Sequence, residues 1–234
     1  MTTTDVTTIA PIDHGEAMGL QAIELDRAIA LLRSLDTEDW LTPTVCPDWD
    51  VRQMWLHVLG ACEAGASMRE NAHQMLAARK RQKELGVPLE AGLSGIQVAE
   101  RTDLSPGELV DRLVTVAPKT VKGRSRTPRP MRAVKIAVDA PVVEKWSVGY
   151  LVDIIYLRDA WMHRVDTARA TGKELVLTPE HDGRIVADIV AEWARRHGRP
   201  FTLELTGPAG GAITSGTRGE PMVLDAVEFC WLLA

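Results

Sequence analysis

The sequence is poor in the features that would define a secreted or membrane protein. Its 234 residues include three cysteines, Cys46, Cys62 and Cys230, an odd number at wide spacing. This pattern argues against a disulfide scaffold and predicts free thiols in a reducing cytoplasm. No apolar run approaches the roughly 20 residues that span a bilayer. The first residues, MTTTDVTTIAPIDHGE, lack the basic-then-apolar order of a signal peptide. We therefore expect a cytoplasmic protein that makes no membrane contact.

An excess of positive charge is also missing. The 27 Lys and Arg residues against 32 Asp and Glu leave a formal net charge of −5, which argues against a broad nucleic-acid-binding face. Aromatic residues are few except for tryptophan, with seven Trp against two Tyr and two Phe, and we expect the tryptophans to fill helix interfaces. Hydrophobic residues make up 45% of the chain, which is enough for a sizeable core.

Helical periodicity is the strongest pattern in the first half of the chain. Apolar residues recur on one helical face over about residues 15–35, which predicts a first helix. Asp50 followed by Gln53 is a capping-box variant, from which a second helix is predicted over Val51–Arg81. Residues 84–104 contain Gly86, Pro88, Gly92 and Gly95 and are predicted to form a loop with weak structure.

Two further helices follow. Ser105, Pro106 and Glu108 supply an N-cap, a proline at the first helical position and a capping glutamate for a third helix. A basic segment then follows, KTVKGRSRTPRPMR (119–132), which we interpret as a solvated connection or as a positive rim that attracts an anionic substrate. A fourth helix is predicted over about residues 147–170, with Gly172 as its C-cap. Four long helices indicate a bundle.

The last sixty residues have a different pattern. Thr178 and Pro179 open a helix, FTLEL alternates like a strand, GPAGG is typical of a turn, and AITSG fits a partner strand. Asp225 and Glu228 are placed to cap a short final helix. The sequence therefore predicts a mainly α protein with a helical bundle over residues 1–172 and a small α/β domain over 173–234.

A carboxylate and a histidine stand four residues apart in the fourth predicted helix, within YLVDIIYLRDAWMH. Residues four apart lie on the same side of a helix, so Asp159 and His163 point the same way and are close enough to bind one ion. Ile155 and Met162 on that side are apolar, which indicates a face that looks inward. A buried carboxylate is costly unless it is paired or binds a metal.

His57 is a second inward-facing histidine, on the second predicted helix. It aligns with small and apolar residues, and Gly60 and Ala61 leave room beside the imidazole. His57, Asp159 and His163 together would make a three-ligand metal site with an open position, the arrangement of a reactive zinc site. Imidazole ligands also suit Ni²⁺ and Fe²⁺. The alternative is a hydrogen-bonded core histidine, with Asp159 paired to Arg158 or Arg164.

Other residues offer weaker candidates. Cys46 or Cys62 with a histidine would suggest a thiol nucleophile, but no orienting third group is evident in the sequence, and we therefore interpret these cysteines as buried inert thiols. Asp166 follows His163 by one turn and is placed either to orient its imidazole or to take part in helix capping or a surface salt bridge.

Two segments resemble a known family. TVCPDWDVRQMWLHVLG resembles the Thr-x-Cys-x-x-Trp-x-Val-Arg-x-x-x-x-His segment of the mycothiol-dependent maleylpyruvate isomerase family, a branch of the DinB-like superfamily. RDAWMHRVDTARATG resembles that family's second metal-binding helix, with its His-Arg-x-Asp ending. Both segments stand in the family's order and separation, followed by the expected small C-terminal domain. The resemblance therefore extends over most of the chain.

The resemblance implies a DinB-like four-helix bundle with an α/β tail domain. It also implies a divalent metal ion, usually Zn²⁺, held by His57, Asp159 and His163. The family's isomerase has Glu where this chain has Asp159, so the acidic arm here is one methylene shorter. That enzyme also uses an Arg from its tail domain, and no motif in this chain identifies its counterpart.

The function implied by the resemblance is activation of a low-molecular-weight thiol, with mycothiol as the cosubstrate. The thiolate would act on a small electrophilic substrate by isomerisation or by thiol transfer. The alternative is a non-catalytic helical bundle that binds a metal or a small ligand, because one fold hosts many functions. An open metal position facing an accessible pocket would favour the enzyme.

Overall fold

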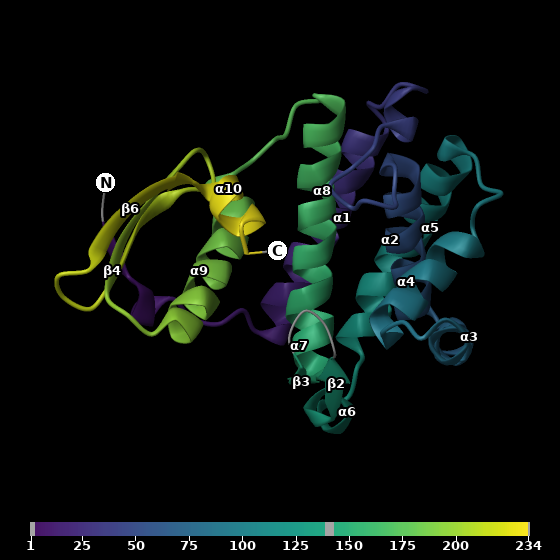
Figure 1. The fold of residues 1–234 in the computed structure, drawn as a ribbon, viewed down its shortest axis with the longest axis horizontal. Coiled ribbons are helices and arrows are strands. Elements are labelled where there is room, and N and C mark those ends of the chain that lie inside the picture. Colours follow the sequence, from purple (N-terminus) through teal and green to yellow (C-terminus); the bar gives the residue numbers. More distant parts are fainter. Residues whose placement is uncertain (1–2, 139–142, 234) are drawn as a thin grey trace. The chain divides into compact units, whose positions relative to one another are not determined.

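The chain divides into two compact units. The computed structural model describes residues 3–138 and 143–233. One unit, here called the helical unit, comprises His14–Glu174. The other, the sheet unit, comprises Met1–Asp13 and Leu175–Ala234 (Figure 1). The N-terminal strand thus belongs with the C-terminal segment, whereas the sequence placed residues 1–172 together in the bundle. The mainly helical class with a small sheet region is confirmed.

Four long helices form the bundle of the helical unit. Its elements in chain order are α1 (His14–Leu32), η2 (Asp39–Leu41), α2 (Val51–Ala66), α3 (Met68–Leu85), α4 (Leu89–Ala99), α5 (Pro106–Ser125), α6 (Arg129–Ala133), β2 (Lys135–Val138), β3 (Glu144–Ser147), α7 (Val148–Tyr150), η3 (Leu151–Ile155) and α8 (Tyr156–Thr171). Helix α1 contacts α5 and α8, and α2 contacts the same two helices, so that the four close a ring. Helices α3 and α4 contact each other and α2, and they form an outer layer on the bundle.

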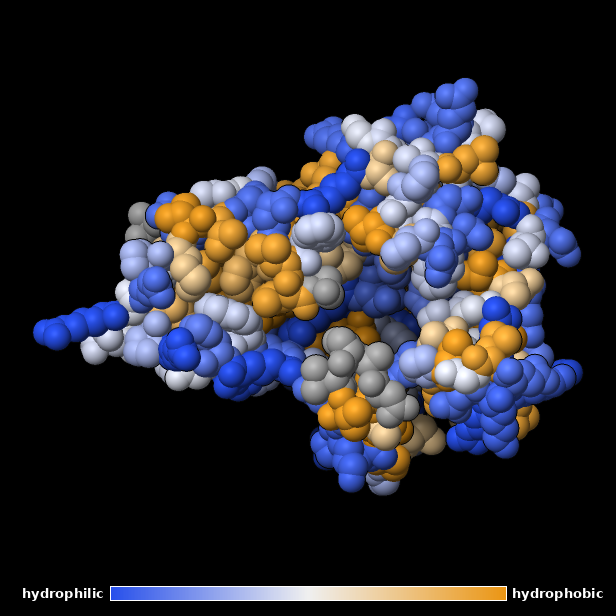
Figure 2. All heavy atoms as spheres, in the orientation of Figure 1, coloured by the Kyte–Doolittle hydropathy of each residue, from blue (hydrophilic) through white to orange (hydrophobic). Residues whose placement is uncertain are grey.

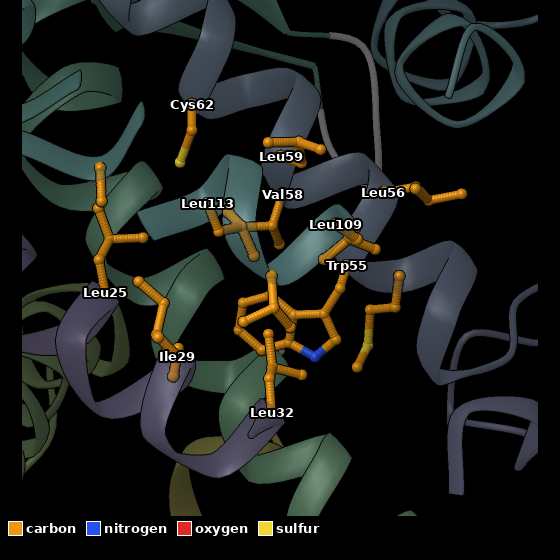
Figure 3. Packing of buried hydrophobic residues seen from close by; sticks show 14 of the residues in the cluster. Leu25, Ile29, Leu32, Trp55, Leu56, Val58, Leu59, Cys62, Leu109 and Leu113 are labelled. Atoms are coloured by element: carbon orange, nitrogen blue, oxygen red, sulfur yellow. The ribbon is translucent and has the colours of Figure 1, made fainter. Parts of the chain in front are cut away.

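The bundle core consists of aliphatic side chains around one tryptophan. Leu25, Ile29 and Leu32 of α1 and Leu109 and Leu113 of α5 are buried on inward faces of their helices (Figure 3). Trp55 of α2 is fully buried among them, and Trp161 of α8 is fully buried as well. Burial of such side chains contributes about 1.5–3 kcal/mol each, and the placement of the two tryptophans agrees with the expectation from composition.

Each of the four helix–helix contacts of the bundle also includes at least one polar contact. These polar contacts join α1 to α5, α1 to α8, α2 to α5 and α2 to α8, and they are Arg124–Gln21 (2.8 Å), Arg164–Glu24 (2.6 Å), Thr120–Cys62 carbonyl (2.6 Å) and Trp55–Thr167 (2.7 Å). Buried hydrogen bonds are directional, whereas apolar packing is not. These polar contacts therefore fix the register of the helices that carry the candidate site residues.

The second predicted helix is in fact two helices. Ser67 has extended backbone angles (φ −141°, ψ 117°), and its hydroxyl accepts from the Glu70 amide at 3.3 Å, so it ends α2 and caps α3. The predicted loop over 84–104 is wrong, because residues Leu89–Ala99 form α4. Gly92 allows this helix to approach α3: a Cβ there would lie 2.9 Å from the Ala78 carbonyl oxygen. Gly92 therefore serves the close packing of α4 against α3 rather than a turn.

The basic segment is mostly helical rather than a free connection. Its first part completes α5, which ends at Ser125, and Arg129–Ala133 form α6. The fourth predicted helix runs through α7, η3 and α8, and Gly172 (φ 70°) is its left-handed C-cap, as predicted. The segment η3 is a π-helical turn, which holds one residue more than an α-helical turn.

The sheet unit packs helices on a four-stranded sheet. Its further elements are β1 (Thr3–Asp5), η1 (Val6–Thr8), η4 (Pro179–Gly183), α9 (Arg184–His197), β4 (Phe201–Thr206), β5 (Gly211–Ser215), β6 (Glu220–Asp225) and α10 (Ala226–Trp231). The strand order is β1-β5-β4-β6, in which β4 and β5 are antiparallel and both outer strands pair in parallel. The predicted β4–β5 hairpin is confirmed, while β1 and β6 were not anticipated.

Alternate residues of β4 form the core of the sheet unit. Phe201, Leu203 and Leu205 are buried, and the residues between them are exposed. Trp193 of α9 packs on Phe201 with ring centroids 4.8 Å apart and on Phe229 of α10 at 5.3 Å. Asp225 caps α10 through the amides of residues 227 and 228, as the sequence predicted.

The surface of the helical unit mixes hydrophilic and hydrophobic side chains. On the face of this unit that Figure 2 shows, hydrophobic residues lie in separate groups among hydrophilic ones. Over the part of the chain that the structure describes, no helix combines the length and the apolar character needed to cross a membrane.

Candidate metal centre

Two helices of the bundle bring three metal-ligating side chains together. Helix α2 begins at a full capping box, in which the Asp50 carboxylate accepts from the Gln53 amide (2.7 Å) and the Gln53 side chain accepts from the Asp50 amide (3.0 Å). His57 lies two turns farther along α2. Asp159 and His163 lie one turn apart on α8, on the same side, as their spacing predicted.

The Asp159 carboxylate lies between the two imidazole rings. Its Oδ1 is 3.4 Å from His163 Nε2, and its Oδ2 is 3.7 Å from His57 Nε2. The two rings face each other edge-on, with centroids 5.6 Å apart and an interplanar angle of 87°. One ligand atom from each of the three residues lies within 4.8 Å of the others. The structure therefore brings together all three residues that the sequence singled out.

These separations suit a common metal ion. Ligand bonds of 2.0–2.1 Å in a tetrahedral zinc site separate neighbouring ligand atoms by about 3.3 Å. The observed 3.4 and 3.7 Å are slightly longer, and they are too long for hydrogen bonds between nitrogen and oxygen. Both ring nitrogens of His163 and Nδ1 of His57 are buried with no hydrogen-bond partner among the described residues. Buried polar atoms normally have partners, so the unpartnered Nε2 of His163, which faces the Asp159 carboxylate, fits a bound cation.

The three groups strongly perturb one another's protonation. Burial alone would raise the pKa of Asp159, but His163 and His57 outweigh it and hold the pKa of the carboxyl well below its usual range. Burial alone would lower the pKa of His163, but the Asp159 carboxylate outweighs it and raises the pKa of that imidazole. Without a metal ion, the cluster thus keeps a positive charge on His163 next to an ionised Asp159.

Arg164, one of the two arginines considered as a partner for Asp159, pairs with another acid. The Arg164 guanidinium donates to Glu24 of α1 at 2.6 and 3.1 Å, and both side chains are buried. Asp166, the proposed orienting residue, places its Oδ2 3.9 Å from His163 Nδ1. That distance allows an electrostatic contact and excludes a direct hydrogen bond.

Residues that the sequence did not single out hold the histidines in place. The Trp49 ring lies against His57, with centroids 5.3 Å apart. The Thr167 hydroxyl donates to the His163 carbonyl oxygen (2.7 Å) and accepts from the Trp55 indole N–H (2.7 Å). Trp55 is on the helix of His57, so this chain of hydrogen bonds fixes α2 and α8 in register beside the cluster. The Trp55–Thr167 hydrogen bond is difficult to predict from the sequence, because the two residues are 112 positions apart.

A narrow pocket borders the cluster on the inside of the bundle. Asp159 lines it, and its other lining residues come from α1, α2, α5 and α8: Gln21, Glu24, Leu25, Val58, Ala61, Cys62, Arg124, Tyr156, Leu157 and Ala160. The Asp159 side chain is 32% exposed, so the cluster is not sealed from solvent. Ala61 lines this pocket as the sequence suggested. Gly60 instead faces α4, where a Cβ would lie 2.6 Å from the Gln97 side chain.

Cys62 is not an activated nucleophile. Cys62 is buried in the pocket wall, and burial raises the pKa of its thiol, with Arg124 opposing the effect. A protonated thiol is a poor nucleophile. This agrees with the interpretation of Cys62 as an inert core thiol.

Comparisons with known proteins identify structures of the same fold. A crystal structure of the mycothiol-dependent maleylpyruvate isomerase matches with a TM-score of 0.57 and 15% sequence identity, over 98% of this chain and 90% of that chain. A crystal structure of a histidine-to-alanine mutant of that enzyme matches equally well. At this identity the likeness shows a shared fold. No curated protein matched the sequence.

The family is identified by a match within the helical unit. The family model described as the mycothiol maleylpyruvate isomerase N-terminal domain matches residues 22–168, which include most of α1, all of α2 and α5, and α8 as far as Ala168. His57, Asp159 and His163 all lie within this match, which spans more than half of the chain. The protein therefore belongs to the mycothiol maleylpyruvate isomerase N-terminal domain family.

Proposed function

We propose that His57, Asp159 and His163 hold one divalent metal ion, and that the protein is an enzyme that uses this ion to activate a low-molecular-weight thiol. The observation that carries the proposal is the convergence of the three ligand atoms within 4.8 Å, with buried ring nitrogens that have no hydrogen-bond partner in the described chain. Zn²⁺ suits two imidazoles and a carboxylate, and Ni²⁺ and Fe²⁺ are the alternatives.

Three protein ligands support a reactive site over a structural one. Structural zinc sites use four protein ligands, whereas catalytic ones use three and leave a position for a water or a substrate. The partial exposure of Asp159 and the adjoining pocket give that position an approach from solvent. These features favour the enzyme over the non-catalytic metal-binding bundle.

The metal would lower the pKa of a coordinated thiol and so supply a thiolate near neutral pH. The chain's own residues then have defined roles. His57 and His163 would bind the ion through the Nε2 atoms that face Asp159, and Trp49 and Thr167 contact the two histidines and would hold them in place. No protein general base is needed for this activation.

Family membership supports mycothiol as the thiol. A thiolate that adds to an electron-poor carbon–carbon double bond converts it to a single bond. Rotation about that bond and departure of the thiolate then give the isomer, with no net change in atoms. A thiolate that displaces a leaving group instead remains attached, which is thiol transfer. The isomerase named among the structural neighbours supports the first outcome for a small electrophilic substrate. The free thiols Cys46, Cys62 and Cys230 support a cytoplasmic location.

Metal analysis of purified protein tests the proposal. Wild-type protein should bind one Zn²⁺ per chain, and His163→Ala should lose it while keeping its helical circular-dichroism spectrum. His73→Ala is the matched control, because His73 is an exposed histidine paired with Glu100 on another face of the helical unit. Cobalt-substituted wild type should then change its visible spectrum when mycothiol is added. Full metal occupancy in His163→Ala, or a cobalt spectrum insensitive to thiol, would contradict the proposal.

A further inference from the structure

One arginine of the basic segment points into the bundle rather than to solvent. Arg124, in the last turn of α5, is 6% exposed, whereas Arg126 and Arg129 in the same segment are exposed. Its side chain passes across α2 at Gly65, where a Cβ would lie 2.9 Å from Arg124 Nε. The missing side chain at residue 65 is thus what lets the guanidinium reach the interior.

The guanidinium of Arg124 has neutral partners. Its Nη1 donates to the Gln21 side-chain oxygen (2.8 Å) and its Nη2 to the Ala61 carbonyl (3.3 Å). Its central carbon lies 4.2 Å from the centre of the Tyr156 ring. Arginine has five N–H donors, and these two bonds leave three of them. Nε is one of the three and has no hydrogen-bond partner.

The positive charge of Arg124 is not balanced by a carboxylate in direct contact among the described residues. The two acids that line the same pocket are engaged elsewhere: Glu24 with Arg164, and Asp159 with the two histidines. A buried charge with neutral partners is costly, and arginine does not escape the cost by losing its proton. Buried arginines of this kind are suited to bind an anion.

The position of Arg124 places such an anion beside the metal centre. Gln21, Ala61 and Tyr156, which contact the guanidinium, all line the pocket that Asp159 also lines. Arg124 and Asp159 both act on the Tyr156 phenol. Burial raises the pKa of this phenol, Arg124 opposes the rise and Asp159 adds to it. The guanidinium and the proposed metal ligand therefore share one environment inside the helical unit.

We propose that Arg124 is a substrate-positioning residue that binds one carboxylate group in the pocket next to the metal centre. The role beside a metal rests on the proposed function above, whereas carboxylate binding itself needs no metal. The planar guanidinium binds a carboxylate through two parallel N–H···O bonds, which fixes orientation as well as position. Asp159 lines the same pocket as Arg124, so a carboxylate bound to the guanidinium would lie next to the metal centre. Arg124 would thus select acids over their neutral analogues.

Acetate and acetamide test the proposal, because they have the same shape and differ in charge. In metal-free, ¹⁵N-labelled protein, the Nε–Hε resonance of Arg124 is assigned by its loss in Arg124→Lys. We expect acetate to shift this resonance saturably and acetamide to leave it in place. Arg124→Met should weaken acetate binding about 10- to 100-fold, as loss of a charge-assisted hydrogen bond predicts. Arg126→Met, which removes the same charge from the exposed side of the segment, should bind acetate like the wild type.

The outcomes separate this inference from the proposed function. Equal shifts with acetate and acetamide, or equal acetate affinity in wild type and Arg124→Met, would overturn the role of Arg124. The wild-type titration decides the question even where Arg124→Met does not fold. A separate arm measures Zn²⁺ binding, which we expect to be intact in Arg124→Met. Failure of the wild type to bind Zn²⁺ would overturn the metal proposal and leave the carboxylate result standing.

Discussion

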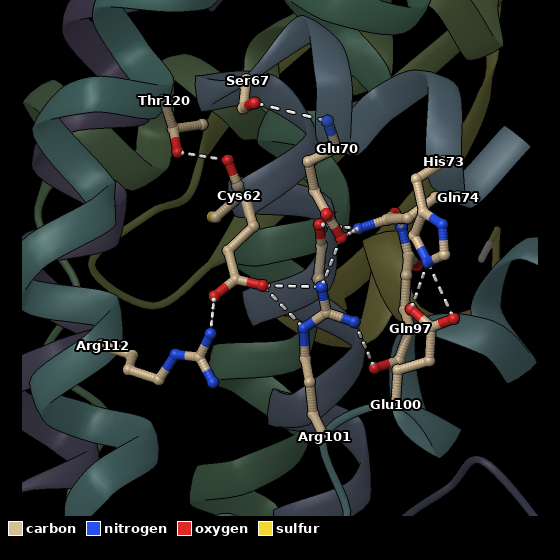
Figure 4. A network of polar contacts seen from close by, with 12 residues as sticks. Cys62, Ser67, Glu70, His73, Gln74, Gln97, Glu100, Arg101, Arg112 and Thr120 are labelled. Carbon is tan, nitrogen blue, oxygen red and sulfur yellow. Dashed lines mark hydrogen bonds and ion pairs between the residues drawn. The ribbon is translucent and has the colours of Figure 1, made fainter.

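Helix α2 carries two clusters of charged and polar groups on different faces, and they differ in how completely they are paired. His57 and Glu63 are six residues apart and so point about 120° apart around the helix. His57 belongs to the candidate metal centre. Glu63 belongs to a set of ion pairs that we call the Arg101 network, formed by Glu63, Glu70, Arg101 and Arg112 (Figure 4).

The Arg101 network satisfies its charges internally. The Arg101 guanidinium is 5% exposed and contacts Glu63 at 2.6 Å and Glu70 at 2.9 Å. Arg112 contacts the other oxygen of Glu63 at 2.8 Å. Two acids thus meet two bases at hydrogen-bonding distance. In the metal centre, the Asp159 carboxylate lies 3.4 Å from Nε2 of His163 and 3.7 Å from Nε2 of His57. The Nδ1 atoms of both rings have no hydrogen-bond partner among the described residues.

The difference separates a structural role from a binding role. Both clusters place an acid among basic groups inside one helical unit, so composition alone does not distinguish them. A network with short internal contacts stabilises the fold and has no need of a ligand. The metal centre has longer separations and a buried, unpartnered Nε2 of His163 facing the carboxylate, which fits a site that is completed by a bound ion.

The largest effect is expected from opening the Arg101 network. Arg101→Met removes a buried cation and leaves Glu63 and Glu70 with fewer partners. Breaking a buried ion pair from one side costs about 3–5 kcal/mol, and the remaining Glu63–Arg112 contact favours the lower end. Urea unfolding measures the loss. Arg79→Met, at an exposed arginine, is the control and should stay within about 0.5 kcal/mol of the wild type. Zinc stoichiometry should be unchanged in both, and a network variant that loses its zinc would erase the distinction.

The second effect concerns the hydrogen bonds that hold the metal centre's helices in register. Thr167→Val keeps the side-chain shape but leaves the Trp55 indole N–H unpaired in the core. We expect a loss of about 1–3 kcal/mol in unfolding free energy, together with weaker zinc binding in a chelator competition. Thr167→Ser retains the hydroxyl and should keep the zinc affinity of the wild type. If Thr167→Val binds zinc as tightly as Thr167→Ser, the register of α2 and α8 does not depend on this link.

A smaller effect is expected from the acid sensitivity of the Arg101 network. Burial acts to raise the pKa of Glu70, but hydrogen bonds from Gln74 and Arg101 outweigh it and lower the pKa below the ordinary 4.5. A lowered folded-state pKa contributes stability above the unfolded value and loses it as pH falls through the folded value. Glu70→Gln should therefore be less stable than the wild type at pH 7, by below about 1 kcal/mol.

The two proteins should become equally stable as the pH is lowered well below 4.5 in the same unfolding assay. Glu84→Gln, in an exposed pair with Lys80, should show no such convergence. A stability difference between Glu70→Gln and the wild type that stays constant with pH would mean that the charge of Glu70 contributes nothing.

The smallest change is expected from lengthening the acidic arm of the metal centre. The family resemblance implies a Glu at the place of Asp159, so we expect Asp159→Glu to hold zinc at least as tightly as the wild type in a chelator competition. Asp159→Ala should lose much of the affinity, because a negatively charged ligand disappears. If Asp159→Ala competes with the chelator as well as the wild type does, the proposed three-ligand site is wrong.

Local patterns predicted the parts of this protein that depend on neighbouring residues. The capping boxes at Asp50 and Ser105 and the left-handed Gly172 were foreseeable, because each acts within four residues. The same holds for Asp159 and His163, which share one helix face. His57 was singled out by the small and apolar residues on its helix face, but only the family resemblance indicated that it meets Asp159 and His163, since no local rule places it opposite α8.

What the sequence missed depends on contacts between distant segments. Helix α4 was interpreted as a loop because Gly92 and Gly95 are typical of turns, whereas here they let α4 approach α3 closely. Arg124 was one cation among six in a basic segment, and its burial depends on Gly65 of another helix. Thr167 has no sequence signal of its own, because its role depends on Trp55 of α2.

The π-helical turn at Leu151–Ile155 has a consequence for how relatives of this chain vary in length. Removing one residue from it would leave an ordinary α-helical turn and keep α8 continuous. The chain before the turn would rotate by about 100° relative to α8, so the contacts of Asp153 with His14 and Arg132 would have to be remade. A deletion between residues 159 and 163 would instead separate the two ligands of α8. Single-residue gaps between this chain and its relatives should therefore fall at 151–155.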